Sequence, residues 1–224
     1  MTDPQLVLAM LADARLPTGG HAHSAGLEPA ILAGLSGDGR RLHEIPALAR
    51  TRLRTITATE AGAAVAARRL WLRGRRDLSP VETAWCARTP SAAMRDTARL
   101  LGRGYLRLAR GLWPDAFAEF VHERPVRPLV LGVVGAVAGL DARQVALLVG
   151  YDDVQTIASA ALKLVPLDPV HAMRWVLDLQ PDITAMADGV ASIAAPEDIP
   201  ASGAPVLDEH AEAHARTTRR LFHA

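Results

Sequence analysis

The chain has 224 residues and a formal net charge of +1, and 50% of its residues are hydrophobic while 4% are aromatic. So small a net charge excludes a general electrostatic attraction to nucleic acid or to an anionic membrane, and the single cysteine, Cys86, excludes an intramolecular disulfide. Because Ala, Leu and Val supply most of the apolar side chains, we expect one all-α domain over residues 1–224, a bundle of roughly eight to ten helices.

The first predicted helix, over residues 5–14, ends at a break. Residues 16–28, which we call the elbow, read Leu-Pro-Thr-Gly-Gly-His-Ala-His-Ser-Ala-Gly-Leu-Glu. Pro17 cannot continue a helix, and Gly19 and Gly20 permit positive φ angles or close approach of another segment. The chain must therefore turn in the elbow.

A second helix is expected to start at the end of the elbow. Ser24 can accept a hydrogen bond from a backbone N–H and so cap a helix over about residues 24–35, in which Leu27 provides an apolar contact. His21 and His23 then lie between two helices.

Capping residues divide the middle of the sequence. Residues 42–72 are predicted as one long helix, because no strong breaker interrupts them. Ser79 with Glu82 three residues later predicts a capping box, and Thr89 before a proline begins a helix that runs to Leu112.

This last helix carries a row of arginines at nearly helical spacing: Arg95, Arg99, Arg103, Arg107 and Arg110. Such a row is typical of a solvated helix face, and it can also bind an acidic partner or RNA.

Residues 129–140 are almost continuously apolar, and this segment is too short to cross a bilayer. We therefore place it at the centre of the bundle. Asp141 followed by Gln144 predicts another capping box, and Gly150 is expected to end the helix that begins there.

Asp152 or Asp153 is expected to begin the next helix, which carries Lys163 near its end. Helices over about residues 168–180 and 182–194 follow.

Residues 195–224 are predicted to form a linker followed by a polar helix over about residues 208–221 and a short tail. This helix has little apolar surface, so we expect a partner to order it.

Catalytic motifs are absent from the sequence. It contains no phosphate-binding loop, no dinucleotide fingerprint and no Gly-x-Ser-x-Gly turn, so we expect neither an enzyme nor a bound cofactor. Cys86, in a predicted helix, is interpreted as a structural thiol.

The histidines leave an alternative open. His21 and His23 can chelate a borderline metal such as nickel if both rings face one side. His210 and His214 share a helix face, and with His223 they offer a second weak chelate. Because neither set forms a complete site, we predict no metal site and interpret His21 and His23 as structural or partner-contacting residues.

The elbow resembles the N-terminal signature of the UreF family of urease accessory proteins. Two further segments resemble the same family: Ala-Leu-Lys-Leu-Val-Pro-Leu at residues 161–167 and Thr-Arg-Arg-Leu-Phe-His-Ala at residues 218–224. His21 stands where the family usually has an aromatic residue, and Asp168-Pro169 replaces a usual Gly-Gln pair.

This resemblance implies a non-catalytic, helical maturation factor. Such a protein joins the accessory protein UreD, also called UreH, and the nickel-carrying GTPase UreG on apo-urease, forms a homodimer, and couples GTP hydrolysis to nickel insertion. The resemblance also implies the partner-binding residues, which are Pro17, Gly19, Gly20, His21, His23, Ser24, Gly26, Leu27, Glu28, Lys163, Arg219, Arg220, Leu221 and Phe222.

Two other functions stay open at this point. One is a self-standing nickel chaperone that uses His21, His23 and the C-terminal histidines. The other is a regulator of nucleic acid that uses the arginine row, although we expect no binding to nucleic acid or membrane. No secretion signal is visible in the sequence, so we expect a cytoplasmic protein.

Overall fold

The computed structural model describes residues 3–218 and 221–222, and within these residues every regular element is helical. The all-α prediction is confirmed. The α-helices are α1 (Pro4–Leu11), α2 (Leu27–Leu32), α3 (Glu44–Arg54), α4 (Ile56–Leu72), α5 (Ser79–Ala87), α6 (Ala92–Leu112), α7 (Pro114–Phe117), α8 (Arg127–Val137), α9 (Ala142–Leu164), α10 (Pro169–Asp178), α11 (Gln180–Val190) and α12 (Pro205–Ala215). Two short 3₁₀ helices, η1 (Gly20–Ala22) and η2 (Pro196–Asp198), complete the set.

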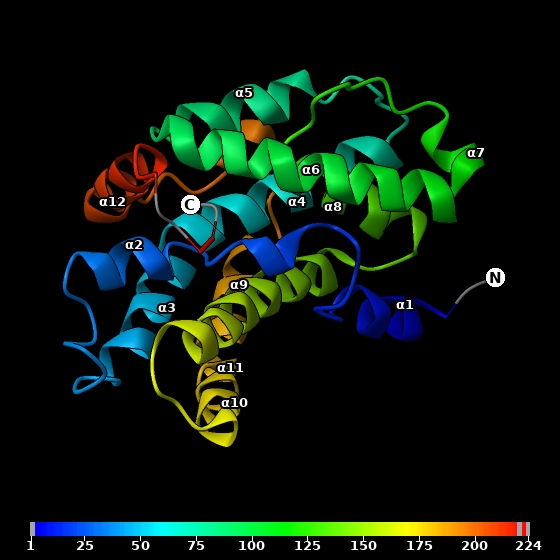
Figure 1. Ribbon diagram of the computed structural model, residues 1–224. Coiled ribbons are helices and arrows are strands. Elements are labelled where there is room, and N and C mark those ends of the chain that lie inside the picture. Colours follow the sequence, from blue (N-terminus) through cyan, green and yellow to red (C-terminus); the bar gives the residue numbers. More distant parts are fainter. Residues whose placement is uncertain (1–2, 219–220, 223–224) are drawn as a thin grey trace.

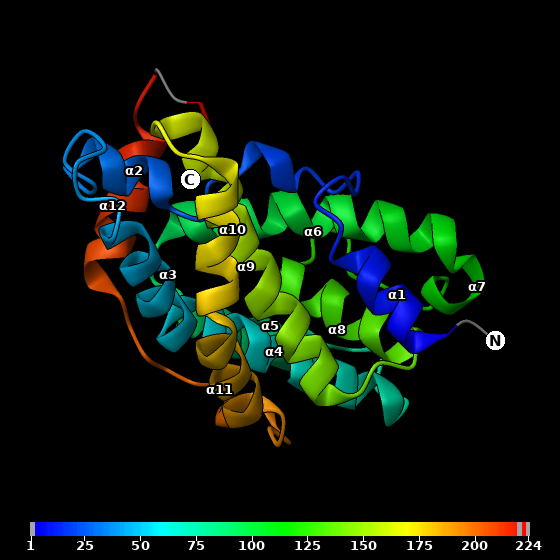
Figure 2. The same cartoon turned by 90° about the horizontal axis from the view of Figure 1, so that it is seen from below.

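The helices form an upper and a lower group around a central pair. In Figure 1, α5 and α6 lie in the upper part of the molecule and α9, α10 and α11 in the lower part, with α4 and α8 between them. Figure 2, seen from below, shows α9, α10 and α11 in front. Both views place α2 and α12 side by side at one end of the molecule.

Helices α4 and α8 approach each other closely at the centre. Gly132 of α8 makes this possible, because a Cβ atom there would lie 2.3 Å from the carbonyl oxygen of Ala64 in α4. Every residue from 127 to 135 is buried. The predicted central position of residues 129–140 is confirmed.

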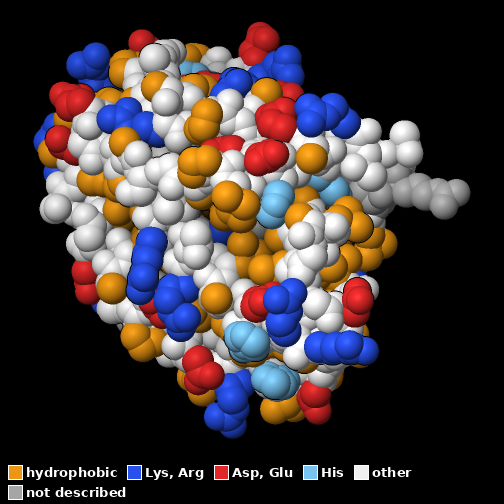
Figure 3. Space-filling model, turned by 90° about the vertical axis from the view of Figure 1, so that its left-hand side faces the viewer, with side chains coloured by type: hydrophobic (Ala, Val, Ile, Leu, Met, Phe, Trp, Pro, Cys, Tyr) orange, Lys and Arg blue, Asp and Glu red, His pale blue; other side chains and the backbone are white. Residues whose placement is uncertain are grey.

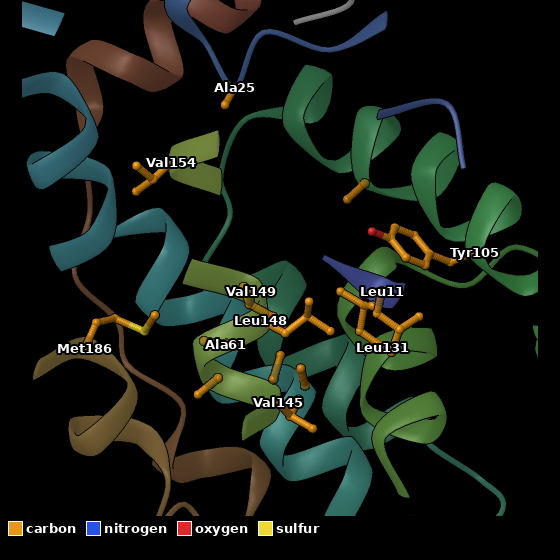
Figure 4. Close-up of a cluster of buried hydrophobic side chains, with 14 of the residues drawn as sticks. Leu11, Ala25, Ala61, Tyr105, Leu131, Val145, Leu148, Val149, Val154 and Met186 are labelled. Atoms are coloured by element: carbon orange, nitrogen blue, oxygen red, sulfur yellow. The ribbon is translucent and has the colours of Figure 1, made fainter. Parts of the chain in front are cut away.

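Side chains from several helices fill the core around this pair. Figure 4 shows Val145 and Val149 of α9 near Leu131 of α8, with Leu11 of α1 and Tyr105 of α6 on one side. All five are buried, so α1 and α6 are fixed to the core by apolar packing.

The predicted single helix over residues 42–72 is wrong. Helix α3 ends at Arg54 and α4 begins at Ile56, because Thr55 leaves the helical region at φ −128° and ψ −96°. The break allows α3 to contact α9 and α11 while α4 passes through the core against α8.

The predicted helix end at Gly150 is also wrong, because α9 continues from Ala142 to Leu164. Gly150 packs inside the bundle, where a Cβ atom would lie 2.7 Å from the Met186 methyl group. Asp152 and Asp153 do not cap a helix, since their side chains bind arginines of other helices. The capping box of Asp141 and Gln144 is confirmed.

The caps of α5 and α6 differ from those predicted. Leu78 precedes α5, and the backbone N–H of Ser79 donates to Asp77, so the predicted capping box is absent. Helix α6 is capped by Ser91 rather than Thr89, with Ser91 Oγ accepting from Met94 N at 3.2 Å.

Helix α9 has the length and composition of a membrane span, but 61% of its apolar window is buried inside the protein. The core helix of a soluble protein has the same property, so α9 is weak evidence for a membrane protein.

Candidate functional site: the elbow and the C-terminal tail

Glycines give the elbow its shape. Gly19 has φ +87° and precedes η1, and Gly26 has φ +77° and precedes α2. L-residues with a side chain rarely adopt these angles. Ser24 is fully buried, and its Oγ accepts a hydrogen bond from Glu28 N at 3.3 Å. Ser24 therefore stabilises the first turn as expected, although α2 begins later than predicted, at Leu27, with Gly26 in the capping position.

Glu28 connects the elbow to the other end of the chain. Its carboxylate is buried, and its two oxygens accept hydrogen bonds from the backbone N–H groups of Leu221 at 2.7 Å and Phe222 at 2.8 Å. The second oxygen also lies 3.1 Å from Nε2 of His214, whose side chain is fully buried. Hydrogen bonds to a charged acceptor are stronger than neutral ones, so Glu28 holds the tail firmly.

Lys163 completes this contact from α9. Phe222 is only 4% exposed, and the Lys163 Nζ lies 5.1 Å from the centroid of its ring, a cation–π arrangement. The three landmarks of the sequence, which lie near residues 16–28, 163 and 221–222, therefore meet at one place.

Apolar side chains remain exposed around this contact. Figure 3 shows the end of the molecule with α2 and α12, and hydrophobic side chains gather across the middle of this face beside histidines. Leu32 of α2 is 66% exposed and Leu221 of the tail 61%. Leu32 lies in α2, and Leu221 lies in the short tail at residues 221–222. We call the exposed parts of these two segments the elbow–tail surface.

Helix α6 supports the elbow from behind. A Cβ atom at Gly104 would lie 2.1 Å from the carbonyl oxygen of Thr18, so only glycine permits this approach. The adjacent Tyr105 forms a hydrogen bond with the Thr18 side chain, and burial raises the pKa of its hydroxyl, which stays protonated. The backbone of α6 thus fixes the position of the elbow.

Arg127 of α8 forms a buried ion cluster next to the elbow. Its guanidinium group donates to both oxygens of Glu60 at 2.6 and 2.7 Å and to Asp152 at 2.7 Å. Burial and the neighbouring carboxylates raise the pKa of Asp152, against the opposing effect of Arg127. Burial alone would lower the pKa of Arg127, but the two carboxylates raise it, so Arg127 stays charged.

Arg52 of α3 forms a second buried ion pair, with Asp153 of α9. Two hydrogen bonds of 3.0 and 2.6 Å join them, and Thr57 donates to the same carboxylate at 2.7 Å. Burial acts to raise the pKa of Asp153, but the Arg52 charge and these hydrogen bonds hold it below its usual value. Because a Cβ atom at Gly26 would lie 3.6 Å from Arg52 Nη1, this pair directly underlies the elbow.

Cavities of about 50 and 100 Å³ adjoin the elbow, and His23 lines both of them. The smaller cavity also contacts Arg52 and Arg127. The larger one is bounded by Lys163 and Phe222 as well as by His21.

The described histidines have different surroundings. His21 is exposed, His23 is half-buried, and His214 is bound to Glu28 rather than paired with His210. Among residues 3–218 and 221–222, no group of three or more His, Cys, Asp or Glu side chains is arranged to hold a metal ion. His223 lies outside the described residues.

The structure brings together most of the partner-binding residues predicted from the sequence. Ser24, Leu27 and Glu28 lie in the buried part of the elbow, Pro17 and His21 lie on its exposed part, and Arg219 and Arg220 lie outside the described residues. Sequence reasoning considered His214 only as part of a weak metal chelate and missed its contact with Glu28, because nothing near His214 in the chain indicates this distant partner.

Comparison with known proteins identifies a family. The sequence profile of the UreF family matches residues 43–180. The urease accessory protein UreF of Mycobacterium sp. strain JLS is 38% identical over 215 residues, with 96% of each chain covered. The UreF proteins of Mycobacterium marinum and Mycobacterium tuberculosis strain H37Rv are 37% and 36% identical, over 96% of this chain and 97% of theirs. The profile match and these identities along nearly the whole chain show that the protein belongs to the UreF family of urease accessory proteins.

Proposed function

We propose that this protein is a scaffold in urease maturation that binds a UreD (UreH) protein and the nickel-carrying GTPase UreG on apo-urease. It acts as a homodimer in the cytoplasm and couples GTP hydrolysis by UreG to the insertion of nickel. Family membership supports a role in urease maturation, and as an accessory protein the chain is not an enzyme.

The observation that carries the proposal is the attachment of the tail to Glu28. Three contacts at one buried carboxylate fold residues 221–222 onto the elbow, and this leaves Leu221 and Leu32 exposed to solvent. Exposed apolar side chains that gather on one face, as they do in Figure 3, are typical of sites that bind proteins. We assign the UreD partner to the elbow–tail surface.

Partner binding would add to the contacts that already hold the tail. A partner that covers Leu221 and Phe222 stabilises the docked state of the tail by binding that state alone. Helix α12 is held by contacts of its own, since Glu212 accepts hydrogen bonds from Ser91 and from the backbone of Ala93 and His214 is buried, so only the tail after it gains most of its stability from the partner.

Lys163 has a separate part in the proposal. It is exposed near the end of α9, at the edge of the elbow–tail surface, so a second partner can bind there beside UreD. We assign Lys163 to the contact with UreG.

Complementation of a urease-positive host that lacks this gene tests the proposed function. We expect the deletion strain to accumulate urease subunits without bound nickel and without activity, and the wild-type gene to restore both. Normal urease nickel content in the deletion strain would contradict the proposal. A Lys163→Ala gene that restores activity fully would contradict only the assignment of Lys163.

A further inference from the structure

The arginine row of α6 divides into two halves with different roles. At its N-terminal half, Arg95 donates to the carbonyl oxygens of Thr89 and Pro90 at 2.6 and 2.8 Å. Arg99 lies 3.7 Å from carboxylate oxygens of both Glu82 and Asp96. These two arginines therefore serve the contacts of α6 with its own neighbours.

The C-terminal half is different. Arg103, Arg107 and Arg110 are exposed, and none of them has an ion pair or hydrogen bond with another residue in the described part of the chain. Their spacing of i, i+4 and i+7 places them on one side of the helix over about 10 Å. A row of uncompensated positive charge therefore lies along the outside of α6.

The row is held rigidly. The opposite side of α6 is buried through Leu101, Tyr105 and Ala109. In Figure 1, α6 runs across the front of the upper part of the molecule. The three guanidinium groups are thus presented on a fixed backbone.

Both charge and apolar character point to a protein ligand. Leu100, which flanks the row, is 40% exposed. Tyr105, the aromatic residue between Arg103 and Arg107, is buried and so cannot stack on a base. Binding of nucleic acid usually relies on a wide basic surface with aromatic side chains for stacking, whereas the net charge of this chain is only +1. A helix with carboxylates along one side and an apolar residue beside them matches the row in charge and shape.

We propose that Arg103, Arg107 and Arg110 form a docking surface for an acidic helix of a partner protein. This site is separate from the elbow–tail surface, because Arg103, Arg107 and Arg110 lie on α6, whereas Leu32 and Leu221 lie on α2 and in the tail. The proposal does not depend on the assignments made to the elbow, Lys163 or the tail.

Binding of labelled helical peptides to the full-length protein tests this proposal. One peptide carries Glu at i, i+4 and i+7 with Leu beside this row, and its isomer has the same composition with the Glu residues spread around the helix. By fluorescence anisotropy at low salt, we expect the aligned peptide to bind about tenfold more tightly, since exposed ion pairs each contribute modestly and add along a row. Equal affinity for the two isomers would overturn the proposal.

Charge reversal provides the specific control. The variant Arg103→Glu/Arg107→Glu/Arg110→Glu should lose the preference for the aligned acidic peptide and gain one for the same peptide with Lys in place of Glu. The matched variant Arg40→Glu/Arg73→Glu/Arg75→Glu changes three other exposed arginines and should bind like wild type. Circular dichroism of both variants checks that they are folded.

Duplex DNA serves as the competing ligand. If duplex DNA binds more tightly than the aligned peptide and this binding is lost in the Arg103/Arg107/Arg110 variant, the row binds nucleic acid and the proposal is wrong. If the Arg40/Arg73/Arg75 variant loses peptide binding equally, the peptide recognises net charge alone, which also overturns it.

Discussion

Glu28 is the residue on which the contact between elbow and tail depends. Replacing Glu28 by Gln keeps the size of the side chain but turns one acceptor into a donor, which then faces a backbone N–H or His214. We expect Glu28→Gln to lower the free energy of unfolding by about 1–3 kcal/mol, because a buried donor is left without a partner.

Hydrogen exchange followed by mass spectrometry measures the local effect. The amides of Leu221 and Phe222 should lose their protection in Glu28→Gln, while those of α4 keep theirs. Glu197→Gln, a change at an exposed position, should leave tail protection as in wild type. Unchanged protection of the tail in Glu28→Gln would show that Glu28 does not hold it.

The ion pair between Asp153 and Arg52 makes the stability of the protein depend on pH. In Asp153→Asn the buried Arg52 loses its charged partner. We therefore expect the free energy of unfolding to fall by about 3–5 kcal/mol near neutral pH. Arg52 holds the pKa of Asp153 below its ordinary 3.8 despite burial, so the native state binds this proton more weakly than the unfolded chain. The ion pair thus contributes fully above the unfolded pKa, and its contribution is lost as pH falls through the native pKa.

Urea unfolding near pH 7 and at about pH 3 measures this dependence. The difference in stability between wild type and Asp153→Asn should shrink on acidification. Asp152→Asn provides the contrast, because burial raises the pKa of Asp152 and wild type should therefore gain stability relative to this variant as pH falls. A difference for Asp153→Asn that does not change with pH would contradict the proposed ionisation.

At the scale of elements, glycine determines how closely α6 approaches the elbow. Gly104 and Gly111 lie in the same helix, but a Cβ atom at Gly104 would strike Thr18 whereas one at Gly111 meets nothing within 4 Å. We expect Gly111→Ala to stabilise the protein by about 0.5–1 kcal/mol, since alanine favours the helix. Gly104→Ala should lower the free energy of unfolding by about 1–3 kcal/mol, because the added methyl group overpacks against Thr18.

Thermal unfolding of the two variants measures the difference, and each serves as the control for the other. If Gly104→Ala were as stable as Gly111→Ala, the elbow would not be fixed by the backbone of α6.

The sequence allowed the helices to be predicted wherever local signals determine them, but not their junctions. Asp141 and Gln144 lie three residues apart and satisfy each other, so the cap of α9 was predictable. Asp152 and Asp153 look like a helix start by the same reasoning. They are ion-pair partners instead, because Arg52 reaches Asp153 from 101 residues away in sequence, which no local pattern indicates.

The same distinction applies to the candidate site. The elbow, Lys163 and the tail were predicted from motifs, and the structure brings Glu28, Lys163 and Phe222 together as one contact region. His214 and the buried Arg127 cluster were not predictable, since their partners come from other helices. Local turn chemistry marks the elbow in the sequence, whereas the side chains that hold it in place depend on the tertiary fold.

As a whole, the molecule is a helical body with one surface completed by its own C-terminal tail. The two buried ion pairs connect α3, α4 and α8 with α9, and the elbow lies over one of them. A partner that binds the elbow–tail surface therefore contacts a region whose backbone is already fixed, and only the tail needs to be ordered on binding.

Native mass spectrometry of this chain, co-purified with the UreD and UreG proteins of its host, measures whether the elbow–tail surface binds a partner. We expect a defined assembly of all three proteins for wild type and for Glu197→Gln. We expect loss of the UreD protein for Glu28→Gln and for the chain that ends at Thr217, while both variants remain folded. If the chain that ends at Thr217 still formed the complete assembly, the elbow–tail surface would not be the partner-binding site.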